Sequence, residues 1–154
     1  MTHPTPDPAA PDAPVRYTRI AQGVAWLTLN RPDQRNSMTP ELLDGFRAAV
    51  ARAREDAELR CLVVTGTGSC FSAGANLNAA LQDDSAGPLS HQRSFAMYEP
   101  FLEITRVEVP VIAALNGHAV GGGFGLSLLC DVRIANEDAK YGANFARLGF
   151  HSGL

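Results

Sequence analysis

Hydrophobic and polar residues alternate along residues 15–29, which favours β-strands because successive side chains of a strand point to opposite faces. Gln22-Gly23 interrupts the alternation with a turn sequence. The preceding residues 1–14 are rich in proline and offer little apolar surface to offset the entropy of ordering. The pattern therefore predicts a disordered tail at residues 1–14, and then a β-hairpin that opens a folded core over residues 15–154.

An amphipathic helix is predicted over residues 40–56. Thr39 is a favourable N-cap, Pro40 suits the first helical position, and Glu41 places a negative charge in the first turn. Apolar residues then recur at spacings of three and four, which gives one buried stripe. The residues of this stripe are Leu42, Leu43, Phe46, Ala49, Val50 and Ala53.

Short apolar runs alternate with helical patterns through the rest of the chain. They predict strands at 61–64, 111–115, 131–135 and 140–142, and helices at 90–105 and 124–130. The last helix is apolar on all sides and is expected to be buried throughout. The order strand, strand, helix predicts a layered α/β fold.

Composition narrows the class of protein. The chain has 154 residues and is 45% hydrophobic, enough for one domain with its own core. A net charge of −3 with scattered arginines argues against nucleic-acid binding. Cys61, Cys70 and Cys130 lack the spacing of metal ligands or a redox pair, so no metal site is expected. The sequence has neither a signal-peptide pattern nor an apolar run of about 18 residues, which predicts a cytoplasmic protein without membrane contact.

Two glycine-containing loops are candidates for binding. Gly121-Gly122-Gly123 precedes a helix, where free N–H groups and the positive end of the helix dipole favour an anion or a developing oxyanion. Ala73-Gly74-Ala75 follows the buried strand at 61–64 and can present a second N–H. Two such donors can each stabilise an enolate by about 3 kcal/mol. The glycines would equally permit tight packing of a helix on a strand, and spacing alone fits both interpretations.

Several motifs occur together in one order. They are Asn30-Arg31-Pro32 with Asn36, Val63-Val64-Thr65-Gly66, Phe71-Ser72-Ala73-Gly74-Ala75-Asn76-Leu77, Pro110-Val111-Ile112-Ala113-Ala114-Leu115-Asn116-Gly117, Gly121-Gly122-Gly123 and Cys130-Asp131. With this order and spacing over residues 15–150, the chain resembles the enoyl-CoA hydratase/isomerase, or crotonase, family. The resemblance implies a spiral of ββα turns that binds coenzyme A thioesters, usually as trimers or pairs of trimers.

The resemblance also implies roles for individual residues. The N–H groups of Ala75 and Gly122 would form an oxyanion hole for the thioester carbonyl. The residues expected to bind the substrate are Ala73, Gly74, Asn76, Leu77, Gly121 and Tyr98. Coenzyme A would be part of the substrate, and no separate cofactor is expected. A Gly122→Pro exchange, which removes a donor N–H, is expected to abolish the function.

The chain departs from the family pattern where hydratases carry two glutamates, because those positions are Gly125 and Phe145. The aspartate usual in the first loop is Asn76, and an acidic position used by some isomerases falls at Gly153. The family also continues into helices that cover the acyl pocket and build the homotrimer or hexamer. The sequence thus predicts a crotonase-like core that lacks this C-terminal helical part.

Other residues are weaker candidates for the missing acid or base. His151 could act as a base, since histidine titrates near 6.5, or be a surface turn residue. Tyr98 could donate a hydrogen bond to the acyl group or be an ordinary core aromatic. For His118, packing or lining of the ligand site is favoured over catalysis. Solvated positions are expected for Glu99, Glu103 and Glu108, and a structural one for Asp131.

Two other enzyme classes fit poorly. A dinucleotide-binding domain needs G-x-G-x-x-G before a helix, and residues 66–71 lack the last glycine. A serine hydrolase needs G-x-S-x-G, which does not occur. The sequence predicts an enoyl-CoA hydratase/isomerase-like protein that stabilises an enolate. The alternative is a non-catalytic acyl-CoA-binding protein or an inactive fragment, because the glycine loops are intact while the glutamates are replaced.

Overall fold

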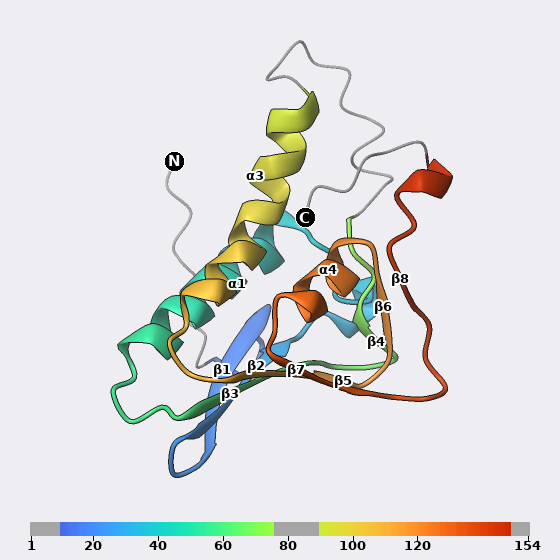
Figure 1. Cartoon of the computed structure of the whole chain (residues 1–154). Helices are drawn as coiled ribbons and strands as arrows, with labels where there is room; N and C mark the ends of the chain where they lie inside the picture. Colours follow the sequence, from blue (N-terminus) through green and yellow to red (C-terminus); the bar gives the residue numbers. More distant parts are fainter. Residues whose placement is uncertain (1–9, 76–89, 149–154) are drawn as a thin grey trace.

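The computed structural model describes residues 10–75 and 90–148, and its largest element is a five-stranded sheet with the order β1-β2-β3-β5-β7 (Figure 1). Its strands are β1 (Val15–Ala21), β2 (Val24–Leu29), β3 (Cys61–Gly66), β5 (Val111–Leu115) and β7 (Val132–Ala135). β1 and β2 form the antiparallel hairpin that the alternation predicted, and β2, β3, β5 and β7 pair in parallel. Parallel neighbours require crossover connections, which here carry helices.

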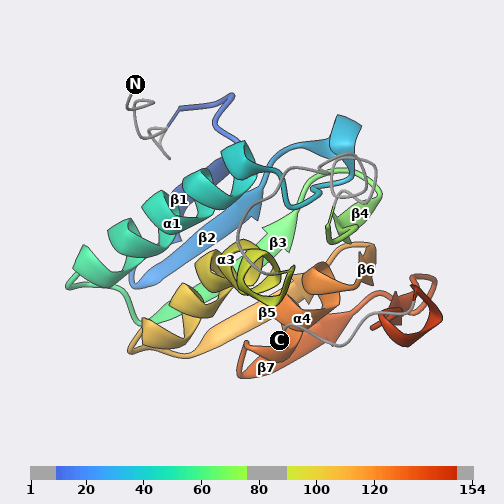
Figure 2. The same ribbon diagram turned by 90° about the horizontal axis from the view of Figure 1, so that it is seen from above.

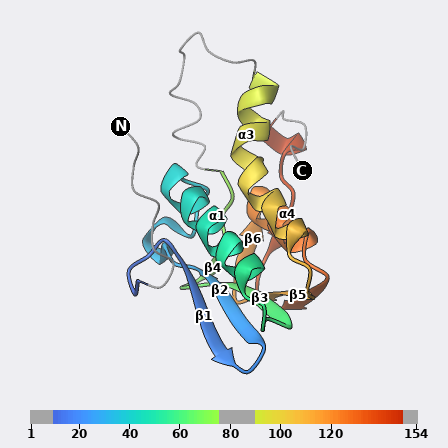
Figure 3. The same ribbon diagram turned by 90° about the vertical axis from the view of Figure 1, so that its left-hand side faces the viewer.

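The three α-helices of the described residues lie on one side of this sheet (Figures 1 and 3). They are α1 (Pro40–Glu55), α3 (Ser90–Leu102) and α4 (Gly122–Leu128). α1 confirms its prediction: the Thr39 hydroxyl accepts a hydrogen bond from the Leu42 N–H at 3.3 Å, and the whole predicted stripe is buried. Seen from above, α1 covers the β1–β2 hairpin (Figure 2).

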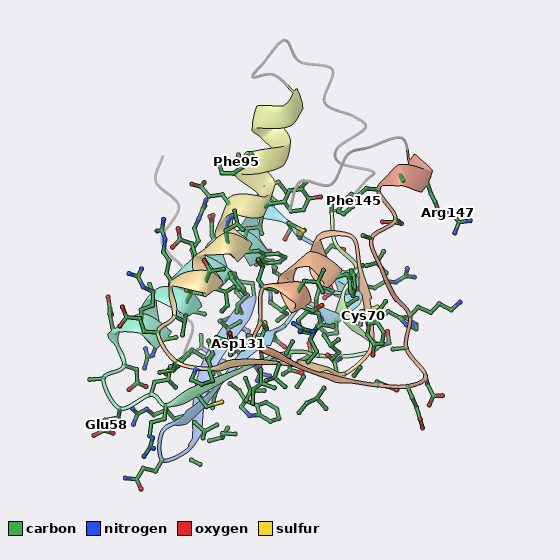
Figure 4. All side chains as sticks on the ribbon, viewed as in Figure 1. Glu58, Cys70, Phe95, Asp131, Phe145 and Arg147 are labelled. Atoms are coloured by element: carbon green, nitrogen blue, oxygen red, sulfur yellow. The ribbon has the colours of Figure 1, made fainter. Side chains whose placement is uncertain are left out.

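The core fills the space between the sheet and the helices. Leu27, Leu62, Val64 and Ala113 are fully buried on the sheet face that meets the helices. The alternate residues of the same strands point to the other face, where Trp26 is 40% exposed. Figure 4 shows side chains extending from this open face, away from the helices. The pleat of the strands therefore divides the sheet into a buried side and an open side.

The structure corrects two of the predicted helices. The segment predicted as one helix over 90–105 is α-helical to Leu102 and then a 3-10 helix, Glu103–Arg106. Pro100 lies inside the last α-helical turns, where it supplies no N–H, and a tightened final turn is common at helix ends. α4 begins at Gly122, two residues before the predicted start, and Leu128 is 56% exposed. The predicted burial of this helix on all sides is wrong, because α4 packs only one side against β4, β6 and α3.

A second, three-stranded parallel sheet has the order β4-β6-β8. Its strands are β4 (Cys70–Ser72), β6 (His118–Val120) and β8 (Tyr141–Gly142). β4 and β6 were not predicted as strands, since three residues are too few to show an alternation. Because β4 and β6 run in parallel, their carboxyl ends lie side by side. The two glycine loops begin at those ends.

Asn36 fastens the loop before α1 to the start of the second sheet. Its side chain is fully buried, accepts a hydrogen bond from the Arg31 N–H at 2.8 Å, and donates to the Thr67 and Cys70 carbonyls at 3.0 and 2.9 Å. The Ser72 hydroxyl donates to the Asn36 carbonyl at 2.8 Å. A buried amide with its hydrogen bonds satisfied fixes one geometry, so the loop is held against β4.

Two further polar side chains hold segments of the chain in place: Asn30 holds residues 11–13, and Asp131 holds the start of β5. Asn30 donates to the Pro11 and Ala13 carbonyls at 3.3 and 3.0 Å, ahead of the predicted core boundary at residue 15. Asp131 accepts a hydrogen bond from the Val111 N–H at 2.8 Å, which confirms the structural position expected for it.

A carboxylate joins the end of α1 to the hairpin. Asp56 accepts hydrogen bonds from the Tyr17 hydroxyl at 2.7 Å and from Arg19 Nε at 2.8 Å, and Arg19 also pairs with Glu58 at 2.9 Å. The hydrogen bonds from Arg19 and then from Tyr17 hold the pKa of Asp56 well below its ordinary 3.8. Burial, together with the hydrogen bond to Asp56, raises the pKa of Tyr17 to about 12.

These shifts predict how stability depends on pH. The pKa of Asp56 is lower in the folded state, so its contribution is present above pH 3.8 and is lost as the pH falls toward the folded-state value. We expect Asp56→Asn to lower the melting temperature at pH 7 and to flatten its decline between about pH 5 and about pH 2. Glu58→Gln, which leaves Asp56 and both its donors in place, is the control. Parallel melting curves for Asp56→Asn and the wild type across this range would contradict the assignment.

Candidate functional site

The two glycine loops are in direct backbone contact where β4 and β6 end (Figure 1). Gly74 has a φ of +77°, a conformation that L side chains rarely adopt. A Cβ placed on Gly74 would lie 2.5 Å from the Val120 carbonyl oxygen and 3.1 Å from the Gly122 nitrogen. A side chain at position 74 would therefore force the loops apart, and glycine is required for this close approach.

Two N–H groups remain available in these loops. Gly122 is the first residue of α4, so its N–H has no partner within the helix. Ala75 forms an isolated parallel bridge with Met38, in which the Met38 N–H donates to the Gly74 carbonyl at 2.9 Å. Neither the Ala75 nor the Gly122 N–H donates a hydrogen bond to any residue that the structure describes. The two residues that the sequence singled out thus lie in contacting loops with unused donors.

The neighbouring N–H groups are engaged within the protein. Ala73 donates to the Arg35 carbonyl at 3.0 Å, Gly74 to the Ser72 hydroxyl at 3.2 Å, and Gly121 to the Gly142 carbonyl at 2.9 Å. These hydrogen bonds fix the backbone that leads into Ala75 and into Gly122. Any contact of Ala73, Gly74 or Gly121 with a ligand would use atoms other than their N–H groups.

Met38 forms a wall of the site that the sequence did not reveal. A Cβ on Gly122 would overlap with Met38 Sδ and lie 3.2 Å from Met38 Cε, so the thioether packs directly on the Gly122 backbone. The side chain is 4% exposed. Met38 precedes the N-cap of α1 in an irregular segment, where no periodicity marks it. The bridge between Met38 and Ala75 is the contact that holds the Met38 side chain beside Gly122.

Tyr98 and Phe145 form an aromatic wall beside Met38. A Cβ on Gly122 would lie 2.7 Å from Tyr98 Cε1, and the Tyr98 side chain is 5% exposed. The Phe145 ring meets the Tyr98 ring edge-on, with centroids 6.3 Å apart and planes at 83°. Figure 4 shows Phe145 on the side of the molecule where α3 rises from the sheet. Burial raises the pKa of the Tyr98 phenol, so the hydroxyl keeps its proton near neutral pH.

Most of the other candidates lie away from these loops. His118 Nδ1 accepts a hydrogen bond from the Lys140 N–H at 2.9 Å, which is a packing role. Glu99 pairs with Arg47 at 3.2 Å, and Glu103 with Arg106 at 3.0 Å. Asn76, Leu77 and His151 lie outside the described residues.

Residues 10–75 and 90–148 contain neither a cluster of metal ligands nor a membrane-spanning helix. There, no group of three or more His, Cys, Asp or Glu side chains is arranged to hold a metal ion. The helices of the same residues are also too short or too polar to cross a membrane.

Comparison with known proteins assigns the family. The family model described as enoyl-CoA hydratase/isomerase matches residues 19–154. The chain belongs to the enoyl-CoA hydratase/isomerase family. This confirms the resemblance found in the glycine loops and the strands before them.

Individual members of the enoyl-CoA hydratase/isomerase family are similar over most of this chain. A probable enoyl-CoA hydratase of Mycobacterium tuberculosis is 42% identical over 134 residues, which are 87% of this chain and 52% of the relative. The (E)-benzylidenesuccinyl-CoA hydratase of Thauera aromatica is 35% identical over 88% of this chain and 52% of its own length. The chain therefore spans about half the length of the curated relatives it matches.

A solved structure confirms the fold. The crystal structure of a putative enoyl-CoA hydratase/isomerase from Mycobacterium abscessus matches with a TM-score of 0.79 and 34% identity, over 88% of this chain and 53% of that one. The predicted α/β crotonase-type fold is correct for the part of the family fold that the chain covers.

The positions at which the family resemblance places the hydratase glutamates lie beside this site. Gly125 is in α4 and donates its N–H to the Gly121 carbonyl at 2.9 Å, and Phe145 packs on Tyr98. Of the described side chains in contact with the Gly122 backbone, Met38 and Tyr98, neither is a carboxylate. Beside Gly122 the nearest described side-chain atoms are the Met38 thioether and the Tyr98 ring, and the Ser72 hydroxyl lies beside Gly123 and Gly74.

Proposed function

We propose that this chain binds an acyl-CoA thioester and holds its carbonyl oxygen between the N–H groups of Ala75 and Gly122. The observation that carries the proposal is the contact of the two loops, in which Gly74 approaches the Gly122 nitrogen so closely that only glycine fits. The Ala75 and Gly122 donors are fixed by neighbouring hydrogen bonds and need no rearrangement. Preorganised donors of this kind stabilise the negative charge of an enolate.

Family membership supports the same ligand class. The relatives described above are named as hydratases of CoA thioesters, and this chain keeps both glycine loops. By family, the activity would be that of a lyase or isomerase acting on an acyl-CoA. Coenzyme A would enter as part of the substrate, and the protein would work in the cytoplasm as a homotrimer or hexamer. These features are inferences from the family for a chain that spans half of its relatives.

A second candidate function is binding of an acyl-CoA without turnover. It is favoured by the replacement of both expected glutamates, since Gly125 has no side chain and Phe145 cannot transfer a proton. The Met38 thioether that packs on Gly122 likewise has no group that transfers a proton. This candidate shares the thioester site with the first and differs only in the chemical step.

Calorimetric titration with crotonyl-CoA, with free coenzyme A as the reference ligand, tests the shared site. We expect saturable binding of the thioester that is at least about tenfold tighter than binding of coenzyme A, a difference of about 1.4 kcal/mol. Equal affinities, or no binding by folded protein, would contradict the proposal. A parallel assay of crotonyl-CoA hydration separates the two candidates, since only the first predicts turnover.

A further inference from the structure

The Ser72 hydroxyl joins the loop before α1 to the glycine loop that contains Ala75. It donates a hydrogen bond to the Asn36 carbonyl at 2.8 Å and accepts one from the Gly74 N–H at 3.2 Å. The Ser72 side chain is fully buried, so water does not compete for either hydrogen bond. One hydroxyl thus fixes two segments that lie far apart in the sequence.

The same serine lies against the first turn of α4. A Cβ on Gly123 would lie 2.6 Å from Ser72 Cβ and 2.7 Å from Ser72 Oγ, so the Gly123 backbone packs directly on this side chain. Gly123 follows Gly122 in the helix. Ser72 is therefore in contact with both loops that supply the proposed donors.

The direction of the Ala75 N–H depends on these contacts. In a trans peptide, the Gly74 carbonyl and the Ala75 N–H share one plane and point in opposite directions. The Gly74 carbonyl accepts a hydrogen bond from the Met38 N–H at 2.9 Å, and Met38 follows Asn36 by two residues. Glycine restricts its own backbone least of all residues, so hydrogen bonds must hold this peptide in place. Without the Ser72 hydroxyl, the Gly74 N–H would lose its acceptor, and the segment that holds the Gly74 carbonyl would lose one of its supports.

We propose that Ser72 is a positioning residue for the thioester site, whose hydroxyl holds the Ala75 N–H where it can share one carbonyl oxygen with the Gly122 N–H. The inference rests on the proposed function, because it concerns the two donors assigned there. Ser72 acts through Gly74 and Asn36 rather than by a contact of its own with the ligand. Donors that are in place before the ligand arrives need no rearrangement, and free coenzyme A has no thioester carbonyl that could use them. The hydroxyl should thus favour the thioester over coenzyme A.

Ser72→Ala, which removes the hydroxyl and leaves the backbone contacts, tests this inference. The measured quantity is the ratio of the dissociation constants of crotonyl-CoA and free coenzyme A, obtained by calorimetric titration. We expect Ser72→Ala to reduce the preference for crotonyl-CoA about fivefold and to leave the affinity for coenzyme A within about twofold. Ser72→Cys, whose thiol is a weaker donor and acceptor, should reduce the same preference and carries the test if Ser72→Ala does not fold.

Ser127→Ala is the matched control. Ser127 is also fully buried, and its hydroxyl donates to the Phe124 carbonyl at 2.6 Å within α4 and not to either loop. Loss of this hydrogen bond should lower the melting temperature but keep the wild-type ratio. A folded Ser72 variant that keeps the wild-type ratio, or that loses affinity for both ligands equally, would show that Ser72 serves stability alone while the thioester site stands. If folded wild type binds crotonyl-CoA no more tightly than coenzyme A, the proposed function is overturned and this inference with it.

Discussion

Ala75→Pro is expected to remove the preference of the protein for an acyl-CoA over free coenzyme A. Proline has no N–H, so one of the two proposed donors to the thioester oxygen is lost. The Ala75 N–H is not part of the bridge to Met38, which uses the Met38 N–H and the Gly74 carbonyl. A hydrogen bond to a neutral carbonyl contributes about 0.5–1.5 kcal/mol, so the affinity for crotonyl-CoA should fall by up to about tenfold while the affinity for coenzyme A stays the same.

Ala75→Gly is the control for this variant, since it keeps the N–H and removes only a methyl group. Titration of wild type and both variants with crotonyl-CoA makes the comparison. Equal binding by folded Ala75→Pro and Ala75→Gly would show that the Ala75 N–H does not hold the thioester.

The Gly122→Pro exchange is less informative about the second donor than the sequence suggested. Any Cβ there overlaps with Met38 and Tyr98, so Gly122→Pro would disturb packing as well as remove the donor.

Gly117→Ala should be among the most destabilising single-methyl additions in the described part of the chain. A Cβ at Gly117 would overlap with the Ser69 carbonyl oxygen and lie 2.6 Å from the Ser69 carbonyl carbon. Both atoms belong to backbone just before β4, which cannot turn aside as a side chain can. Overpacking of this kind costs about 3 kcal/mol. For a domain of this size, that loss lowers the melting temperature by about 10 °C.

Gly142→Ala is the matched control, because no atom lies within 4 Å of a Cβ at that position. Its melting temperature should stay within about 2 °C of the wild type, in line with surface substitutions that touch little. Similar melting temperatures for Gly117→Ala and Gly142→Ala would mean that the approach of Ser69 to Gly117 does not constrain the fold. Calorimetric titration with crotonyl-CoA should also show weaker binding by Gly117→Ala than by Gly142→Ala, since the clash pushes β4 away from β6.

The elements that could be predicted from the sequence are those whose pattern is local. The hairpin follows from its alternation and turn, and α1 from its cap, its proline and its stripe of apolar residues. The family motifs added the expectation of a spiral of ββα turns, which periodicity alone does not support. The same motifs pointed to the loops at Ala75 and Gly122, and the structure brings those loops into contact.

The features that the sequence did not predict depend on tertiary contacts. β4 and β6 are too short for a periodic pattern and exist because they pair with each other. Met38 lies in an irregular loop, and only its bridge to Ala75 places the thioether on Gly122. Leu128 looks like a core residue by hydrophobicity alone. Its exposure follows from the orientation of α4, which a single sequence does not contain.

The parallel pairing of β4 with β6 also has a consequence for the order in which the elements form as the chain folds. Ser72 and His118 lie far apart in the sequence, and their strands pair only after the chain between them has closed into a loop. The entropy of that closure is lost before the pairing returns any stabilisation, which makes such contacts slow to form. The hairpin and α1 need only neighbouring residues. We therefore expect the proposed thioester site to be among the last parts of the molecule to form, after the hairpin and α1.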